Sequence, residues 1–323
     1  MIIIIKAKNI KRCAVIHPPE YGGIYILWLL LVFLLGYFLK SPTLAAESVR
    51  SALHVCAVGL IPSLFPFIVL VNMMRISGMA EWISSTLGRP ISWLFGIDEQ
   101  CSYAVILGSL GGFPIGAICT NELYMSGVID KSSAERLLTF TNNASPAFCI
   151  GAIGISLFSD AALGIKLYFC QLISAVIIGI VQRRNCKSTQ HTKKRTVSST
   201  HLSDILTHSV TAGGETVFKI CAFAIFFAVV GDALCIVSNR FFGDTVSAIS
   251  AVLCELTLAA RKCSELGGKA GYLMCAFAVG WSGISVHMQT ASVLSKSGIS
   301  MRRYLICKFF QGVLCCIMMF VLI

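Results

Sequence analysis

The sequence predicts an all-α membrane protein, a polytopic helix bundle with two internal repeats that each contain a broken or re-entrant helical hairpin. Three observations support this prediction. Of 323 residues, 56% are hydrophobic and 13% are charged, whereas about a quarter of an average soluble domain is charged. The mean hydropathy is +0.81, and apolar runs of spanning length recur along the chain. Two of these runs are interrupted by glycines.

This composition excludes an ordinary soluble domain, a disordered chain and a nucleic-acid-binding protein. The net charge of +11 is therefore interpreted through membrane topology, and the lipid bilayer is the first expected partner. Most of the fifteen cysteines stand singly in apolar runs, and no C-x-x-C pair occurs. Cysteine then acts as a small apolar residue, so we expect no disulfide framework, metal site or cofactor.

Residues 1–20 are basic, and an uninterrupted apolar run follows at residues 21–39. We interpret them as a cytoplasmic N-terminal segment and a first transmembrane helix. A cleavable signal peptide is the alternative, because small residues at 44–46 resemble a cleavage site.

Residues 45–182 form the first predicted membrane repeat. Its first apolar block, residues 53–74, carries Pro62 and Pro66, which bend or break a helix and favour a position facing protein. A shorter, more polar segment at residues 82–97 is expected to be interfacial or partly spanning.

Gly111, Gly112 and Pro114 then interrupt the apolar run at residues 101–125, which predicts a re-entrant turn with exposed backbone. Asn142, Asn143 and a following proline precede the next apolar run and predict a second broken helix. Residues 163–181 are a cleaner span.

Residues 183–204 hold six basic residues and form the predicted cytoplasmic linker; contact with anionic lipid is the alternative role. The second repeat, residues 205–323, contains a span at 215–237 and a moderately apolar segment at 242–260. An apolar run at 271–294, broken near Gly283, and a closing span at 303–323 follow. Counting crossings places the N-terminus, the linker and the basic pair at 302–303 inside the cell.

The two halves align on each other with an offset of 171 residues, which places Gly112 on Gly283. Downstream, residues 123–131 fall on residues 294–302 without a gap, pairing two leucines and two Ser-Gly dipeptides. The alignment predicts one broken hairpin at corresponding positions in each half. In secondary transporters such breaks mark the substrate site, because unwound backbone offers hydrogen-bonding groups near the midplane.

Four motifs in order resemble the YlbJ-like family of sporulation integral membrane proteins, within the wider group of nucleoside-recognition or gate domains. They are IPSLFPF at 61–67, GGFPIGA at 111–117, AERLL at 134–138 with NNASPAF at 142–148, and GWSGISVHMQ at 280–289. The resemblance covers roughly residues 45 to 323, and both halves are gate-like. The first 20 residues and the basic linker match none of its motifs.

The resemblance implies a multi-pass inner-membrane protein of endospore-forming bacteria that is needed for spore cortex formation and has a presumed transport role. The implied solute is small and polar, and the group name extends it to nucleoside-like molecules. The family offers no agreed catalytic residues to carry over. No nucleic-acid partner is expected, and a homo-oligomer is left open.

The expected solute contacts are the glycines and polar groups at the two breaks. Glu122 is either a solute or cation contact that shares a cavity with the asparagines, or an interfacial partner of Arg136. His287 and Gln289 either contact the ligand or form cross-helix hydrogen bonds. The full set is Gly111, Gly112, Pro114, Glu122, Asn142, Asn143, Gly283, His287 and Gln289.

No catalytic motif of a hydrolase, nucleotide-binding enzyme or metalloprotease occurs, so we expect no enzyme. Two functional hypotheses follow. The first is a transporter or permease of a small polar solute, and the second is a membrane scaffold that supports spore cortex or envelope assembly, in which the glycines only allow close helix packing.

Overall fold

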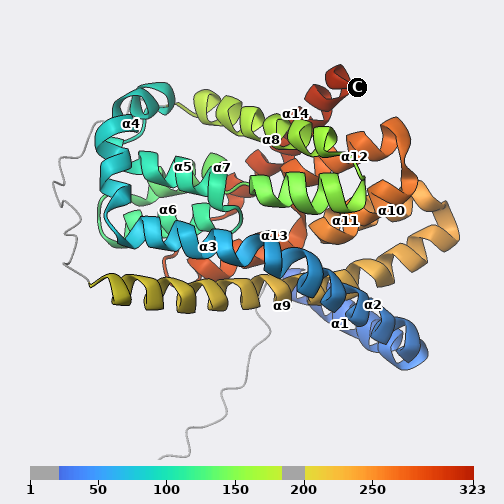
Figure 1. Ribbon diagram of the computed structural model, residues 1–323. Coiled ribbons are helices and arrows are strands. Elements are labelled where there is room, and N and C mark those ends of the chain that lie inside the picture. The colour runs from blue at the N-terminus through green and yellow to red at the C-terminus, as the bar shows by residue number, and fades with distance from the viewer. Residues whose placement is uncertain (1–21, 184–200) are drawn as a thin grey trace, which may run out of the picture. The chain divides into compact units, whose positions relative to one another are not determined.

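The computed structural model describes residues 22–183 and 201–323, and all regular elements within them are helical (Figure 1). The chain divides into two units, Met1–Thr43 and Leu44–Ile323. The predicted segment 1–20 and most of the linker at 183–204 lie outside the described residues. In the first unit, helix α1 (Gly22–Lys40) covers the predicted first transmembrane helix. All further elements are described within the second unit.

Among the described residues, three helices are each long and apolar enough to cross a bilayer. They are α8 (Ala161–Val181), α9 (Leu202–Phe242) and α14 (Arg302–Leu322), and two bent helix pairs raise the number of candidate spans to five. Helix α8 begins at Asp160, whose side chain accepts a hydrogen bond from the backbone N–H of Leu163 at 3.0 Å. These helices confirm the membrane-embedded, all-α prediction.

The proline-containing block forms α2 (Pro42–His54), a π-helix η1 (Val55–Leu60) and α3 (Ile61–Ile76). Pro62 stands in the first turn of α3, where a missing backbone N–H costs nothing. The sharp bend lies later, near Gly78, where α3 turns by 81° into α4 (Met79–Phe95). Gly78 adopts a φ of 87°, which a glycine reaches without strain.

The first glycine break is a re-entrant hairpin. After the short helix η2 (Glu99–Cys101), helix α5 (Ser102–Gly111) packs along α6 (Ile115–Met125), and residues 112–114 form the turn. Gly108 and Gly116 allow the two helices to touch, because a Cβ on Gly108 would lie 2.9 Å from the Cα of Gly116. The prediction of a re-entrant turn is confirmed here.

A broken helix follows this hairpin. Helix α7 (Lys131–Thr141) ends at Asn142, residues 142–145 are non-helical, and the chain resumes as a π-helix η3 (Ala147–Leu157). The predicted break at the two asparagines is therefore present.

The second half repeats this order with a different register. Its hairpin consists of α10 (Asp244–Cys254) and α11 (Leu256–Leu266), which pack on each other and turn at Glu255. The predicted break near Gly283 separates α12 (Gly268–Trp281) from α13 (Gly283–Leu294). Helix α12 packs mainly on α14, whereas α13 packs on α9 and α6, so this element is a broken helix.

The offset of 171 residues therefore pairs a hairpin with a broken helix. The two hairpin turns, at Gly112 and Glu255, are 143 residues apart. Sequence alignment missed this correspondence because the second hairpin turns without glycine or proline. This difference does not change the number of times the second half crosses the membrane. The hairpin of α10 and α11 turns back, and the broken helix of α12 and α13 crosses, so one of the two segments crosses in either register.

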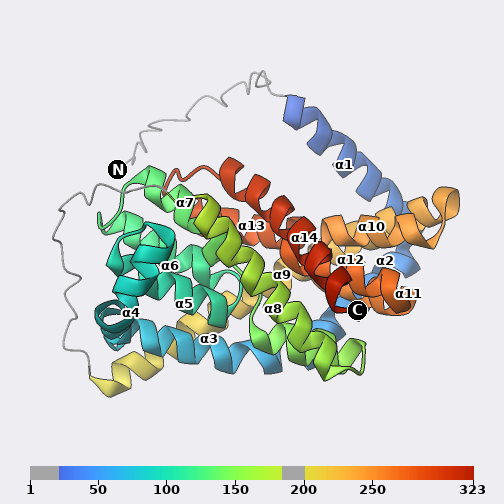
Figure 2. The same cartoon turned by 90° about the horizontal axis from the view of Figure 1, so that it is seen from above.

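The two hairpins approach the middle of this unit from opposite ends. In Figure 1 the pair α5 and α6 lies toward one end, and the pair α10 and α11 toward the other. Figure 2, from above, shows the same separation, with α13 between them. Helix α13 contacts α6, α10 and α11, so the second break touches both hairpins.

Candidate functional site

The tips of both hairpins meet the first helix break and helix α13, which follows the second break, around one small cavity of about 40 Å³. Polar groups on its wall come from Ser145, Glu255, Thr257 and Gln289. The full lining is Leu60, Leu64, Gly112, Phe113, Ala144, Ser145, Phe148, Ile220, Ala224, Glu255, Leu256, Thr257, Val286 and Gln289.

Gly112 brings the first tip against the first break. Its φ is +76°, and a Cβ there would lie 2.9 Å from the Cβ of Ser145 and 3.0 Å from its backbone nitrogen. Only glycine adopts this positive φ without strain and also leaves room for Ser145. Ser145 in turn accepts a hydrogen bond from the backbone N–H of Phe148 at 3.2 Å, which caps the start of η3.

Glu255 forms the second tip and is only 3% exposed. Its carboxylate accepts hydrogen bonds from the Thr257 hydroxyl and from the backbone N–H of Leu258, the latter at 2.7 Å. The carboxyl group therefore caps the N-terminus of α11, a position where the helix dipole favours a negative group. Gly283, in the second break, allows this tip to approach, because a Cβ there would lie 3.2 Å from the carbonyl oxygen of Cys254.

A buried polar network ties the first break to the second half. Asn142 donates from Nδ2 to the hydroxyls of Thr290 and Tyr304, at 2.9 and 3.2 Å. The Tyr304 hydroxyl also lies 3.3 Å from Nδ1 of His287. Asn142 Oδ1 and His287 Nε2 are buried and have no hydrogen-bond partner within the described part of the chain. Two hydrogen-bonding atoms thus remain unsatisfied beside the break.

A second network surrounds a fully buried lysine on α14. Lys308 is 0% exposed, donates to Oε1 of Gln311 at 2.8 Å, and lies 5.3 Å from the ring centroid of Phe113 at the first tip. Gln311 donates to Oδ1 of Asn143 at 2.9 Å and to the backbone carbonyl of Gln171 at 3.1 Å. No carboxylate pairs with Lys308 among residues 22–183 and 201–323. A fully buried ionisable side chain without a partner of opposite charge is costly in a membrane, which makes Lys308 a candidate functional residue.

The structure brings together most of the residues that the sequence predicted. Gly112 and Gln289 line the cavity, and Gly111 and Pro114 flank its first tip. The remaining four do not line the cavity: three take part in the two buried networks, and one allows the close approach at the second tip. They are Asn142, Asn143, Gly283 and His287.

Glu122 does not join them, which corrects the expectation of a cavity shared with the asparagines. It stands eight residues after Pro114, about 12 Å along α6, at the base of the hairpin. There it pairs with Arg75 and lines a separate pocket between α4 and α6. The alternative partner, Arg136, instead donates to the carbonyls of Phe95 and Gly96 at the end of α4.

Sequence reasoning missed Glu255, Lys308, Gln311 and Tyr304. Glu255 lies in the segment at residues 242–260, which the sequence marked only as moderately apolar, whereas the residue is the buried tip of a hairpin. The available signal was an isolated polar or charged residue inside an apolar run, which applies to Lys308 and Gln311 on α14. Within the described residues, no cluster of three or more potential ligands could hold a metal ion.

The comparisons with known proteins give one relative, which is an integral membrane protein. No family model matches the sequence. The chain is 26% identical to the sporulation integral membrane protein YlbJ of Bacillus subtilis (strain 168), over 87% of this chain and 78% of that protein. This similarity extends over most of both chains. The chain is therefore similar over most of its length to a sporulation integral membrane protein of the YlbJ type.

Proposed function

We propose that this protein is a transporter of a small polar solute, which it binds between the two hairpin tips and the two helix breaks. The observation that carries the proposal is the convergence of both hairpin tips, the first break and helix α13, which follows the second break, on one cavity. Non-helical backbone within a membrane bundle is tolerated where it is buried in protein or lines a cavity, and broken helices at corresponding positions are typical of transporter substrate sites.

The cavity wall indicates the chemistry of the solute. The Gln289 amide, the Glu255 carboxylate and two hydroxyls offer donors and acceptors, while Phe113 and Phe148 offer flat apolar faces. Such a wall suits a molecule with a ring and several hydroxyl or amino groups. A nucleoside-like solute fits this description, and the wall polarity favours a neutral or cationic molecule over an anion.

The size of the cavity implies a closed state. About 40 Å³ of space holds a few water molecules, and ligand pockets are typically about 300–1,000 Å³. At least one hairpin tip must therefore move to admit a solute. We infer that the two repeats rock against each other to expose the cavity to alternate sides of the membrane.

The relative is named as a sporulation protein, and we propose that this chain also acts during sporulation, in the formation of the spore cortex. A carrier would serve that process by moving a solute that the developing spore or its surrounding cell requires. The competing hypothesis is a scaffold, in which the same contacts only hold the bundle together.

The two functions separate in one experiment. Untargeted metabolite analysis compares cells that produce the wild-type chain, Gln289→Leu and Glu255→Gln, at matched membrane abundance, with cells that lack it. A carrier predicts that a metabolite difference between wild type and empty cells disappears in both variants. Gln100→Leu, which lies in the separate pocket beside Glu122, is the matched control and should retain the difference. Identical metabolite levels in cells with and without the wild-type chain would support the scaffold.

A further inference from the structure

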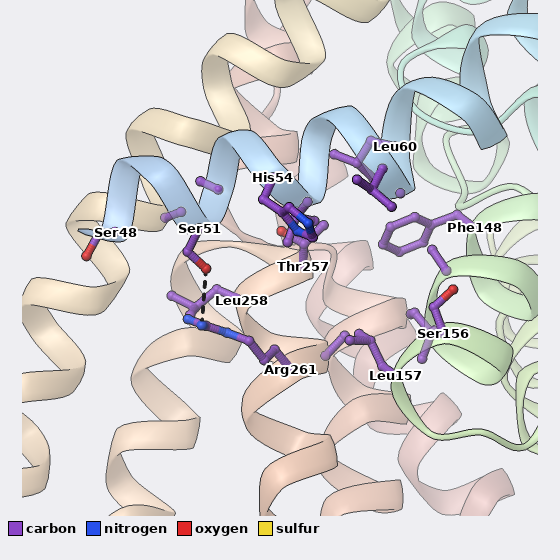
Figure 3. Close-up of a pocket in the computed structure, with 18 of the residues that line it drawn as sticks. Ser48, Ser51, His54, Leu60, Phe148, Ser156, Leu157, Thr257, Leu258 and Arg261 are labelled. Atoms are coloured by element: carbon purple, nitrogen blue, oxygen red, sulfur yellow. Dashed lines mark hydrogen bonds between the residues drawn. The ribbon is translucent and has the colours of Figure 1, made fainter. Parts of the chain in front are cut away.

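A wider pocket of about 220 Å³ lies beside the closed cavity (Figure 3). It is formed by α2, η1, η3, α9 and α11. Its walls are mostly apolar, and its one strongly polar end holds Arg261. The guanidinium donates to the Ser51 hydroxyl at 3.3 Å and lies 3.4 Å from the Asp232 carboxylate.

Only one layer of side chains separates this pocket from the cavity. Leu60, Phe148 and Thr257 line both spaces. Leu60 is 3% exposed and Phe148 7%, so both fill the partition between the pocket and the cavity. Figure 3 shows the Phe148 ring directed toward Leu60, with Thr257 nearby. Thr257 belongs to the second hairpin tip, two residues after Glu255.

The two large partition residues stand at the ends of π-helices. Leu60 is the last residue of η1, and Phe148 is the second residue of η3, directly after the non-helical segment 142–145. The two π-helices also contact each other. A π-helix is rarer and less tightly wound than an α-helix and is frequent at functional sites. Conversion of one turn to α-helical winding would rotate the side chain at its end about the helix axis and change its contacts in the partition.

We propose that this pocket is the entry vestibule of the carrier, and that Leu60 and Phe148, with Thr257, form the gate that closes the cavity from it. The inference rests on the proposed function, because it identifies the route by which the solute reaches its site. The vestibule suits a solute with an apolar face and a hydrogen-bond acceptor, which the Arg261 end receives.

Cysteine labelling tests the gate without knowledge of the solute. Val286→Cys introduces a thiol on the cavity wall, and Ser156→Cys introduces one in the vestibule. A small methanethiosulfonate reagent is added to the full-length protein in membranes, and mass spectrometry of the labelled peptides distinguishes these sites from native cysteines. We expect position 156 to react readily and position 286 slowly.

Trimming the gate should then expose the cavity. Adding Phe148→Ala or Leu60→Ala to Val286→Cys should raise the labelling rate at position 286 by about tenfold or more, since closed sites react through rare opening. Leu157→Ala is the matched control, because Leu157 lines the vestibule but not the cavity, and it should leave position 286 slow. Membrane abundance and thermal unfolding verify that each variant folds, and Phe148→Leu serves as a milder variant.

Two outcomes overturn the gate. Position 286 could remain equally slow after both trimming substitutions, or Leu157→Ala could accelerate it as much as Phe148→Ala does. These results are distinguishable from failure of the transport proposal. Labelling reports access to the cavity alone, whereas the metabolite comparison reports movement of a solute.

Discussion

At the scale of single residues, small side chains determine how closely the irregular segments approach each other. Gly108 and Gly116 in the first hairpin both face the end of α7, where a Cβ on Gly116 would lie 2.2 Å from the carbonyl oxygen of Thr141. That carbonyl belongs to the backbone and cannot move aside as a flexible side chain would. The position of the first break relative to the hairpin therefore depends on the missing Cβ atoms.

Replacement of Gly116 by alanine should destabilise the protein by about 3 kcal/mol, because overpacking forces the hairpin and the break apart. The measurement is thermal unfolding of the purified protein in detergent. Gly151→Ala in η3 is the matched control, because no atom lies within 4 Å of its added Cβ. It should shift stability by less than about 1 kcal/mol. Equal unfolding temperatures for the two variants would contradict the close packing of the first hairpin.

The two asparagines and Glu122 show which positions of polar residues can be predicted from the sequence. Asn142 and Asn143 were identified because two asparagines and a proline before an apolar run are typical of a broken helix. Glu122 was expected beside the asparagines, but it lies too far along α6 from the turn to reach them. Its partner Arg75 is 47 residues away in the chain. Such a pairing depends on how α3 packs beside α6, which no local pattern records.

At the scale of elements, helix α7 illustrates how a cap fixes the start of a broken helix. The Asp130 carboxylate accepts a hydrogen bond from the backbone N–H of Ser133 at 2.7 Å. This backbone hydrogen bond, supported by one from the Ser133 side chain, lowers the pKa of Asp130 below its ordinary value of 3.8. The residue lies in the exposed loop at the base of the first hairpin.

Asp130→Ala should lower stability at neutral pH by about 1 kcal/mol, the usual contribution of an N-terminal cap. Because the pKa is lower in the folded state, the charged carboxylate contributes this stability above the ordinary pKa and loses it as pH falls through the folded value. Thermal unfolding at pH 7 and at about pH 3 checks both statements. The difference between wild type and Asp130→Ala should shrink at the lower pH, and Asp130→Asn should retain most of the cap at both.

An undiminished difference at low pH would mean that Asp130 contributes through something other than its charged cap.

Elements with turn residues were predicted well, and the element without them was not. Gly112 and Pro114 identified the first hairpin, and the asparagines with Pro146 identified the break before η3. The second hairpin turns at Glu255, which takes an extended conformation with φ of −148° and ψ of 132°. Any residue adopts that backbone without strain, so neither glycine nor proline is required there. Its one signal was a carboxylate in an apolar run.

At the scale of the whole second unit, each half contains a hairpin, a broken helix and a long helix, in that order. Composition alone predicted the membrane-embedded helical class, because it depends on averages over hundreds of residues. The register of the repeat was wrong, because an alignment of apolar segments follows glycine and serine spacing and does not reveal which segment turns back. Packing between distant helices decides that question.

The opposite approach of the two hairpins makes a prediction about topology. Ser126 lies at the base of the first hairpin and Lys269 just after the second, and both are exposed. With the basic linker inside the cell, α9 crosses outward and α10 starts from the outer face, so Lys269→Cys should be labelled from outside. Ser126→Cys should be labelled from the cytoplasm only. The measurement is reaction with a membrane-impermeant maleimide in intact cells and in opened cells.

Labelling of both positions from the same face would show that both hairpins enter the membrane from that face. The inverted arrangement of the two halves would then be wrong. A reversal of both faces, with Lys269→Cys inside and Ser126→Cys outside, would retain the inverted arrangement and place the linker outside. The experiment therefore separates the architecture from its orientation. The architecture matters more for transport, because two hairpins that reach one cavity from opposite faces give each side of the membrane its own movable barrier.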